Sequence, residues 1–212
     1  MRNLLNYDGP VLRFLNKIVY SAWLNILWFI CCLPIFTIGA STTALCYCCQ
    51  KIAREEEGYI TKSFFHSFKN DFKKSTILGL LMTVLGIVLS VDAYALFHLW
   101  SSNAFWTLLS AILILAWIAY IIVLLWIFQL NARFENTIVN MFKNSIMLGM
   151  RFLFCTVTMA GVYVIMGWVI YYFCTPLIVL GVGTCALFNA MLMTNILIQC
   201  ENQGDTDEDS MA

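Results

Sequence analysis

Four long apolar segments dominate the sequence, at about residues 76–100, 105–130, 152–173 and 177–199. A helix rises about 1.5 Å per residue, so about 20 apolar residues cross the ~30 Å hydrocarbon core of a bilayer. Each of the four segments is long enough to do so. The sequence therefore predicts an all-α integral membrane protein.

The composition agrees with this fold class and excludes two broad functions. Hydrophobic residues make up 61% of the chain and charged residues only 11%, against ~45–50% and ~25% in soluble domains. With 212 residues in total, the chain has no room for a separate soluble catalytic domain. The 12 Lys and Arg balance the 12 Asp and Glu, and without a net positive field we expect no binding to nucleic acid.

Residues 18–50 form a further uncharged run, which is too long for one helix. Pro34 and the small-residue stretch Gly39–Thr42 interrupt it near its middle. We expect a helical hairpin with arms at roughly 18–34 and 41–54. Each arm is short for a ~30 Å core, so the hairpin either crosses the bilayer twice or re-enters it against the other helices.

The positive charges set the expected topology. All 12 Lys and Arg lie within residues 2–17, 51–74 or 133–151, and the short joints at 101–104 and 174–176 contain none. Basic segments stay on the cytoplasmic side, so we expect about six helical passes with both termini inside. Residues 1–200 would form one membrane domain with helix pairs at 76–130 and 152–199, and the acidic residues 201–212 a disordered tail.

A short internal repeat accompanies the helix pairs. FKKSTILG at 72–79 matches FKNSIMLG at 142–149 in five of eight positions, and Asn70 corresponds to Asn140. Both copies enter an apolar segment from the same predicted side of the membrane. An internal duplication would therefore be a parallel repeat.

Residues 61–74 are predicted to form a cytoplasmic amphipathic helix. Gly58 marks the end of the preceding helix, and Thr61 is the expected N-cap. Phenylalanines fall on one face of the helical wheel and cations on the other. Such a helix lies at the bilayer interface, docks into a groove of a partner protein, or only anchors the fold. A partner-binding surface here would consist of Phe64, Phe65, Phe68, Lys69, Phe72 and Lys73.

Asp92 is the only acidic residue within an apolar segment, and His98 follows six positions later. An intramembrane carboxylate is costly unless it is paired or hydrated. Asp92 and His98 are therefore candidate transport residues, with a hydrated, outward-facing Asp92 as the alternative. The amides of Asn25, Gln129 and Asn131 could line a path through the membrane, but hydrogen bonding between helices is the commoner role of such groups.

No arrangement of residues indicates an enzyme. The sequence lacks a metalloprotease motif, a phosphate-binding loop and a recognisable pairing of nucleophile and base. Cys46, Cys48 and Cys49 are close together, but no His lies at ligand spacing and no second CxxC motif exists. We expect them to act as small hydrophobic residues, and we predict no metal or cofactor.

Three strings resemble the YesL-like family of bacterial membrane proteins, a family of unknown function found mostly in Firmicutes. They are GPVLRFLNK at 9–17, CLPIFTIGASTTA at 32–44 (preceded by LNILW at 24–28), and EEGYI at 56–60 with KSFFHSFK at 62–69. The resemblance is densest over about residues 5–80. The motif residues are Gly9, Pro10, Asn25, Pro34, Gly39, Ser41, Thr42, Glu57, Gly58 and Tyr59.

The resemblance implies a context rather than a chemistry. Members of this family are commonly encoded beside carbohydrate ABC-transporter permeases. This implies an accessory subunit of an oligosaccharide ABC uptake system in the bacterial cell membrane, which acts by binding the permease. The alternative is a stand-alone small transporter or channel that uses Asp92. Neither hypothesis fixes an oligomeric state.

Overall fold

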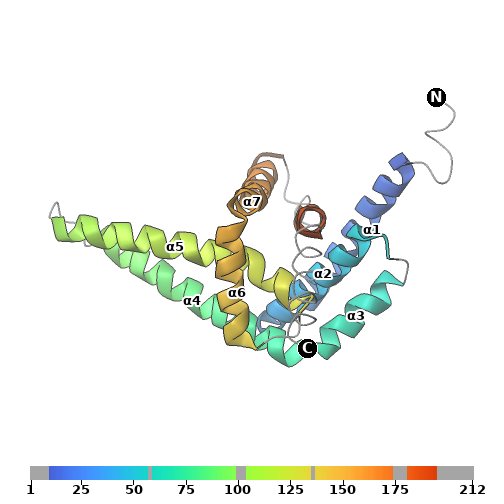
Figure 1. The fold of residues 1–212 in the computed structure, drawn as a ribbon, viewed down its shortest axis with the longest axis horizontal. Coiled ribbons are helices and arrows are strands. Elements are labelled where there is room, and N and C mark those ends of the chain that lie inside the picture. Colours follow the sequence, from blue (N-terminus) through green and yellow to red (C-terminus); the bar gives the residue numbers. More distant parts are fainter. Residues whose placement is uncertain (1–9, 57–58, 99–103, 135–136, 174–180, 195–212) are drawn as a thin grey trace, which may run out of the picture.

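A computed structural model of the chain describes residues 10–56, 59–98, 104–134, 137–173 and 181–194, and these residues contain no β-strand. The first half comprises α1 (Pro10–Cys31), a 3-10 turn η1 (Ile35–Thr37), α2 (Ile38–Ala53) and α3 (Ile60–Asn70). The chain continues with α4 (Phe72–His98), α5 (Ala104–Asn131), α6 (Ile138–Arg151) and α7 (Leu153–Phe173). A further helix covers Gly181–Thr194. Figure 1 shows their arrangement.

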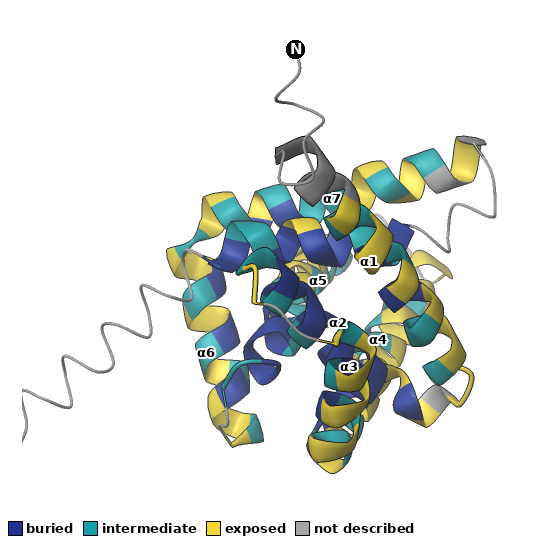
Figure 2. Cartoon of the chain, turned by 90° about the vertical axis from the view of Figure 1, so that its right-hand side faces the viewer, coloured by how far each residue is buried: buried dark blue, intermediate teal, exposed yellow. Residues whose placement is uncertain are grey.

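Helix α2 lies at the centre of the packed part of the molecule. Of its 16 residues, 11 are buried, and most of these are Gly, Ala, Ser, Thr or Cys. Small side chains let neighbouring helices approach closely, and α2 contacts α1, α3, α4 and α5. Figure 2 shows the buried residues gathered around α2, with exposed residues on the outer faces of α3 and α6.

The closest approach joins α2 to α4. A Cβ atom added to Gly79 would lie 2.6 Å from the Cα of Gly39, which is far shorter than any real contact. The two glycines therefore meet backbone against backbone. Any side chain at either position would force the helices apart.

Helices α4 and α5 form a long hairpin that extends away from this packed part (Figure 1). Both are long and apolar enough to span a membrane, yet only 11% and 6% of their most apolar windows are buried by the rest of the chain. Their exposed surface consists largely of Ile, Leu, Val and aromatic side chains. Since such a surface is unfavourable in water, the hairpin is suited to lipid or to another membrane protein.

Helices α6 and α7 are joined by a bend of 97° at Phe152. The indole Nε1 of Trp126, on α5, donates a hydrogen bond of 2.9 Å to Oγ1 of Thr156. That hydroxyl in turn donates to the carbonyl of Gly149 at 3.1 Å, and the Trp126 and Phe152 rings stack with centroids 6.4 Å apart. The bend is thus fastened to α5 from both of its sides.

The end of α2 differs from the expectation. The helix ends at Ala53, and Glu55 rather than a glycine takes the left-handed conformation, with φ of 58°. The amides of Glu55 and Glu56 donate to the carbonyls of Ile52 and Lys51, which is the paired hydrogen-bond pattern that closes a helix C-terminus. Gly58, the residue predicted to end the helix, lies outside the described residues. The helix ends before it, at Ala53, and Glu55 takes the left-handed conformation that was expected of a glycine.

The all-helical prediction is confirmed, and its segment boundaries need two corrections. The predicted amphipathic helix at 61–74 is divided, because α3 ends at Asn70 and residues from Phe72 onward begin α4. Its N-cap is Tyr59 and not Thr61; the Thr61 hydroxyl instead accepts a hydrogen bond from the Trp23 indole at 3.1 Å. The predicted tail at 201–212 lies outside the described residues.

Two described helices, Phe72–His98 and Phe105–Asn131, are each long and apolar enough to cross a membrane, and the bent pair α6–α7 could supply a third span. The arms of the predicted 18–50 hairpin are present as α1 and α2, with the chain reversal at η1. Figure 1 shows α7 almost end on while α4 and α5 lie across the view, so α7 does not run alongside the hairpin.

Candidate functional site

The phenylalanine face of α3 points toward the protein's own core. Phe64 is completely buried and belongs to the cluster around α2, and Phe68 packs against the same cluster. The rings of Phe64 and Phe68 stack with centroids 6.3 Å apart, and those of Phe68 and Phe72 meet edge to face at 5.4 Å. This aromatic column fastens α3 and the start of α4 to the packed part.

The opposite face of α3 is free to contact a partner or a lipid surface. Phe65 is 42% exposed and Lys69 is exposed on the same helix, and Lys73 is exposed at the start of α4. Of the six residues predicted as a partner-binding surface, the structure therefore presents Phe65, Lys69 and Lys73 outward. Phe64 and Phe68 are four positions apart, so they share one face of α3. That face packs on α2, and Phe64 therefore points inward.

Asp92 lies on the α4–α5 hairpin, and it lines a cavity of about 490 Å³ between the two helices. The other described residues lining it are apolar or aromatic, with Trp106 the largest of them. His98 is not part of this lining; its ring packs on Tyr94 with centroids 4.3 Å apart. The structure therefore does not bring Asp92 and His98 into one site.

Buried polar side chains join the helices of the packed part. Nε2 of Gln50 donates to the side-chain oxygen of Gln129 at 2.8 Å and to its backbone carbonyl at 2.9 Å. Nδ2 of Asn131 donates to Oγ of Ser75 at 2.8 Å and to Oγ1 of Thr43 at 3.3 Å. These bonds link α2, α4 and α5, and they confirm the expected interhelical role of Gln129 and Asn131.

The glutamine pair reveals a second repeat that the sequence analysis missed. Gln50 begins the string QKIAR, and Gln129 begins QLNAR. The similarity of the two strings is visible in the sequence, but they are 79 residues apart. FKKSTILG and FKNSIMLG are 70 residues apart, so a search at that one offset does not find the second repeat. Arg54 precedes Phe72 by 18 residues, whereas Arg133 precedes Phe142 by 9. The second copy is therefore shorter between its two conserved strings.

The structure places the two copies in similar surroundings. Ser75 and Ser145 are both fully buried, and Gly79 and Gly149 are both points of close helix contact, with α2 and α5 respectively. The copies diverge afterwards, because α4 continues straight while the chain bends after α6. An internal duplication of a helix, a QxxAR string and a second helix accounts for both sets of contacts.

The motif residues of the resemblance serve mainly to build the packed part. Asn25 and Ser41 are buried, Pro34 precedes η1, and Thr42 accepts a hydrogen bond from the Trp28 indole at 3.3 Å. Pro10 begins α1, and Tyr59 caps α3. Gly9, Glu57 and Gly58 lie outside the described residues.

The described residues contain no group of three or more His, Cys, Asp or Glu side chains arranged to hold a metal ion. Cys46, Cys48 and Cys49 are buried on α2 as free thiols. They fill space where the helices approach closely, which is the role of a small hydrophobic residue.

Comparison with known proteins finds similarity to uncharacterized bacterial proteins. The chain is 24% identical over 200 residues to the uncharacterized protein YteU of Bacillus subtilis (strain 168), which covers 92% of this chain and 89% of YteU. It is 28% identical over 126 residues to the uncharacterized protein YesV of the same organism, covering 57% of this chain and 59% of YesV. No solved structure matches the chain. Residues 21–93, from α1 to α4, match the family described as "Protein of unknown function, DUF624".

Proposed function

We propose that this protein is an accessory membrane subunit that binds another integral membrane protein. The observation that carries the proposal is the α4–α5 hairpin, whose apolar surface the rest of the chain leaves almost uncovered. A membrane protein that works alone buries much of its spanning helices against one another. A hairpin that extends from a packed base is suited to lie against the helices of a partner.

The buried polar groups support a binding role over a transport role. Inside the packed part, Gln50 donates a hydrogen bond to Gln129, and Asn131 donates one to Ser75. Polar groups that line a substrate path must instead be open to water or substrate. These interior hydrogen bonds therefore support a rigid packed part that holds the hairpin, rather than a path for a substrate.

The resemblance to the YesL-like family suggests the partner. We infer that it is the permease of an oligosaccharide ABC uptake system, because members of that family are commonly encoded beside such permeases. In this proposal the chain makes about six passes with both termini in the cytoplasm. The outward face of α3, with Phe65 and Lys69, and Lys73 at the start of α4 then contact the permease at its cytoplasmic side.

Affinity purification from native membranes in a mild detergent tests the proposal. Permease subunits should co-purify in amounts comparable to the tagged protein, as quantified by mass spectrometry. Recovery of the protein alone, or only with copies of itself, would count against an accessory role.

Matched variants then test the α3 face. Phe65→Ser with Lys69→Glu and Lys73→Glu alters only exposed side chains, so the protein should still insert and fold while partner recovery falls at least severalfold. Lys143→Glu is the control, because Lys143 is exposed on α6 and occupies the position of Lys73 in the repeat. If the triple variant recovers as much partner as the original protein, these exposed side chains do not contact the partner. The hairpin would then remain the proposed contact.

The cavity at Asp92 favours a second candidate, a stand-alone transporter or channel. In liposomes, such a protein should give substrate- or pH-driven flux that Asp92→Asn abolishes. Absence of flux, or equal flux in the variant, would exclude this role for Asp92.

A further inference from the structure

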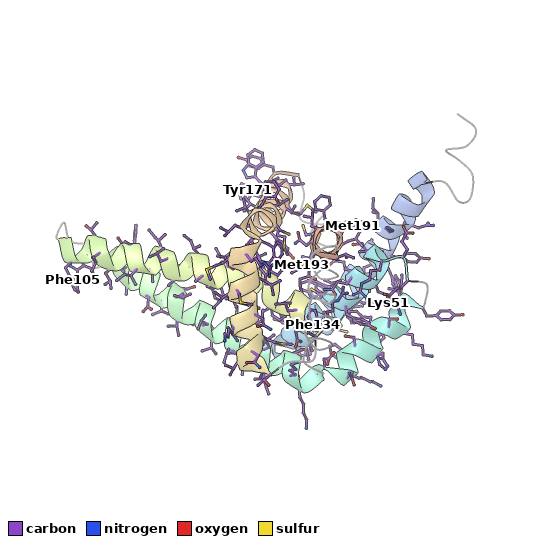
Figure 3. The ribbon with its side chains drawn as sticks, in the orientation of Figure 1. Lys51, Phe105, Phe134, Tyr171, Met191 and Met193 are labelled. Carbon is purple, nitrogen blue, oxygen red and sulfur yellow. The ribbon has the colours of Figure 1, made fainter. Side chains whose placement is uncertain are left out.

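A second, polar cavity of about 210 Å³ lies where the C-terminal ends of α2 and α5 meet. Lys51 lines this cavity, and Figure 3 places Phe105 at the hairpin tip and Phe134 beyond the opposite end of α5. The cavity is therefore far from the cavity at Asp92. Its described lining residues are Tyr47, Gln50, Lys51, Arg54, Glu56, Ala132 and Arg133.

Both copies of the QxxAR repeat contribute to this cavity. Gln50 and Arg54 come from the first copy, and Ala132 and Arg133 come from the second. The hydrogen bonds between Gln50 and Gln129 join the copies at the base of the cavity, at 2.8 and 2.9 Å. Arg54 and Arg133 therefore line one cavity from the same position of the two QxxAR strings, which the Gln50–Gln129 hydrogen bonds hold together.

Among the lining residues that the structure describes, three are cations and one is a carboxylate. Lys51, Arg54 and Arg133 face one carboxylate, Glu56, whose oxygen lies 3.3 Å from Nη1 of Arg54. The C-termini of α2 and α5 each add about half a negative charge.

The donors suit a phosphate group. Guanidinium groups match the geometry of phosphate oxygens, and they donate paired hydrogen bonds to them. Nε of Arg54 is buried and donates no hydrogen bond to any residue that the structure describes. The volume of about 210 Å³ equals that of roughly seven waters at ~30 Å³ each, whereas pockets for drug-sized ligands begin at about 300 Å³.

The position of the cavity favours a lipid as the source of that phosphate. It lies at the end of the spanning helix α5, opposite the hairpin tip, and basic pockets between spanning helices commonly bind lipid headgroups. A phosphodiester headgroup supplies the anionic oxygens that guanidinium groups bind.

We propose that this cavity binds the phosphate group of an anionic ligand, the phosphodiester of a phospholipid headgroup, between Arg54 and Arg133. The site is independent of whether the chain binds a permease. A soluble phosphate ester offers the same chemistry, and the experiment separates the two sources.

The test uses the full-length protein, purified in non-ionic detergent and stripped of lipid. Its thermal midpoint is followed while dioctanoyl phosphatidylglycerol, dioctanoylglycerol or inorganic phosphate is added. The first two probes have the same acyl chains and differ in the phosphate headgroup. Stabilisation by phosphatidylglycerol alone identifies a lipid site. Stabilisation by inorganic phosphate as well identifies a general phosphate site, and equal stabilisation by dioctanoylglycerol overturns the proposal.

Variants locate the binding. Arg54→Gln and Arg133→Gln should each weaken phosphatidylglycerol binding about tenfold, whereas Arg151→Gln, an exposed arginine at the end of α6, should leave it unchanged. Equal weakening in all three would show attraction to general surface charge and would overturn the site. If either cavity variant does not fold, Lys51→Gln and Arg54→Lys replace it, and unchanged affinity in both would equally overturn the proposal.

Discussion

The packed part around α2 and the α4–α5 hairpin are both apolar, and they use that property in opposite ways. α2 is rich in Gly, Ser, Thr and Cys, and most of its residues are buried within the chain. α5 is rich in Ile, Leu and aromatic residues, and little of its apolar window is buried. Small residues mark the helix that other helices surround, and large aliphatic residues mark the helices left for lipid or a partner. The lower hydropathy of α2 accompanies this difference in residue size.

Gly39→Leu should have the largest effect, because it places a side chain where two backbones touch. Even an extra methylene group in a packed core costs about 1–3 kcal/mol, and here no neighbouring side chain can move aside. We expect loss of the monodisperse species in size-exclusion chromatography after detergent extraction.

Gly161→Leu is the matched control, since nothing lies within 4 Å of a Cβ atom at this position on α7. It should leave the elution profile unchanged, and the better helix propensity of Leu favours the fold by up to ~1 kcal/mol. Equal tolerance of both substitutions would show that α2 and α4 are not in contact.

The second prediction compares adjacent residues on α3. Phe64→Ala should lower the free energy of unfolding by roughly 3–5 kcal/mol, because it empties a fully enclosed site. Phe65→Ala should change it by less than about 1 kcal/mol, since Phe65 projects outward. Thermal or denaturant unfolding in detergent measures both. The reverse order would mean that α3 is rotated about its axis, with Phe65 packed on α2.

The third prediction tests whether the hairpin lies in lipid. Ile118→Lys puts a cation on an exposed position near the middle of α5, and it should cost about 2.5–3.5 kcal/mol in an insertion assay. Phe105→Lys, at the hairpin tip, should cost much less because the lysine reaches the bilayer surface. Equal, small costs at both positions would place the hairpin in water.

The sequence predicted the helices well because charges and short polar joints delimit each apolar segment. The sequence could not predict which face of each helix is buried in the protein and which is exposed. The phenylalanines of α3 are equally suited to a partner's groove and to the protein's own core, and only the position of α2 decides between them. The change from a basic to an apolar segment at residue 152 was readable, but the 97° bend there was not, because Trp126 holds it from a distant part of the chain. The cavity between the QxxAR strings was missed because the two repeats have different offsets.

The smallest predicted effect concerns the polar link between the two copies of the repeat. Gln50→Met or Gln129→Met alone leaves a buried amide without its partner, which should cost about 1–3 kcal/mol. The double variant replaces both groups with apolar side chains of similar shape, so it should be nearly as stable as the original protein. A double-mutant cycle of unfolding free energies measures this coupling. Simple addition of the two single effects would mean that each glutamine is held by other groups, and that the packed part does not depend on this pair to join α2 to α5.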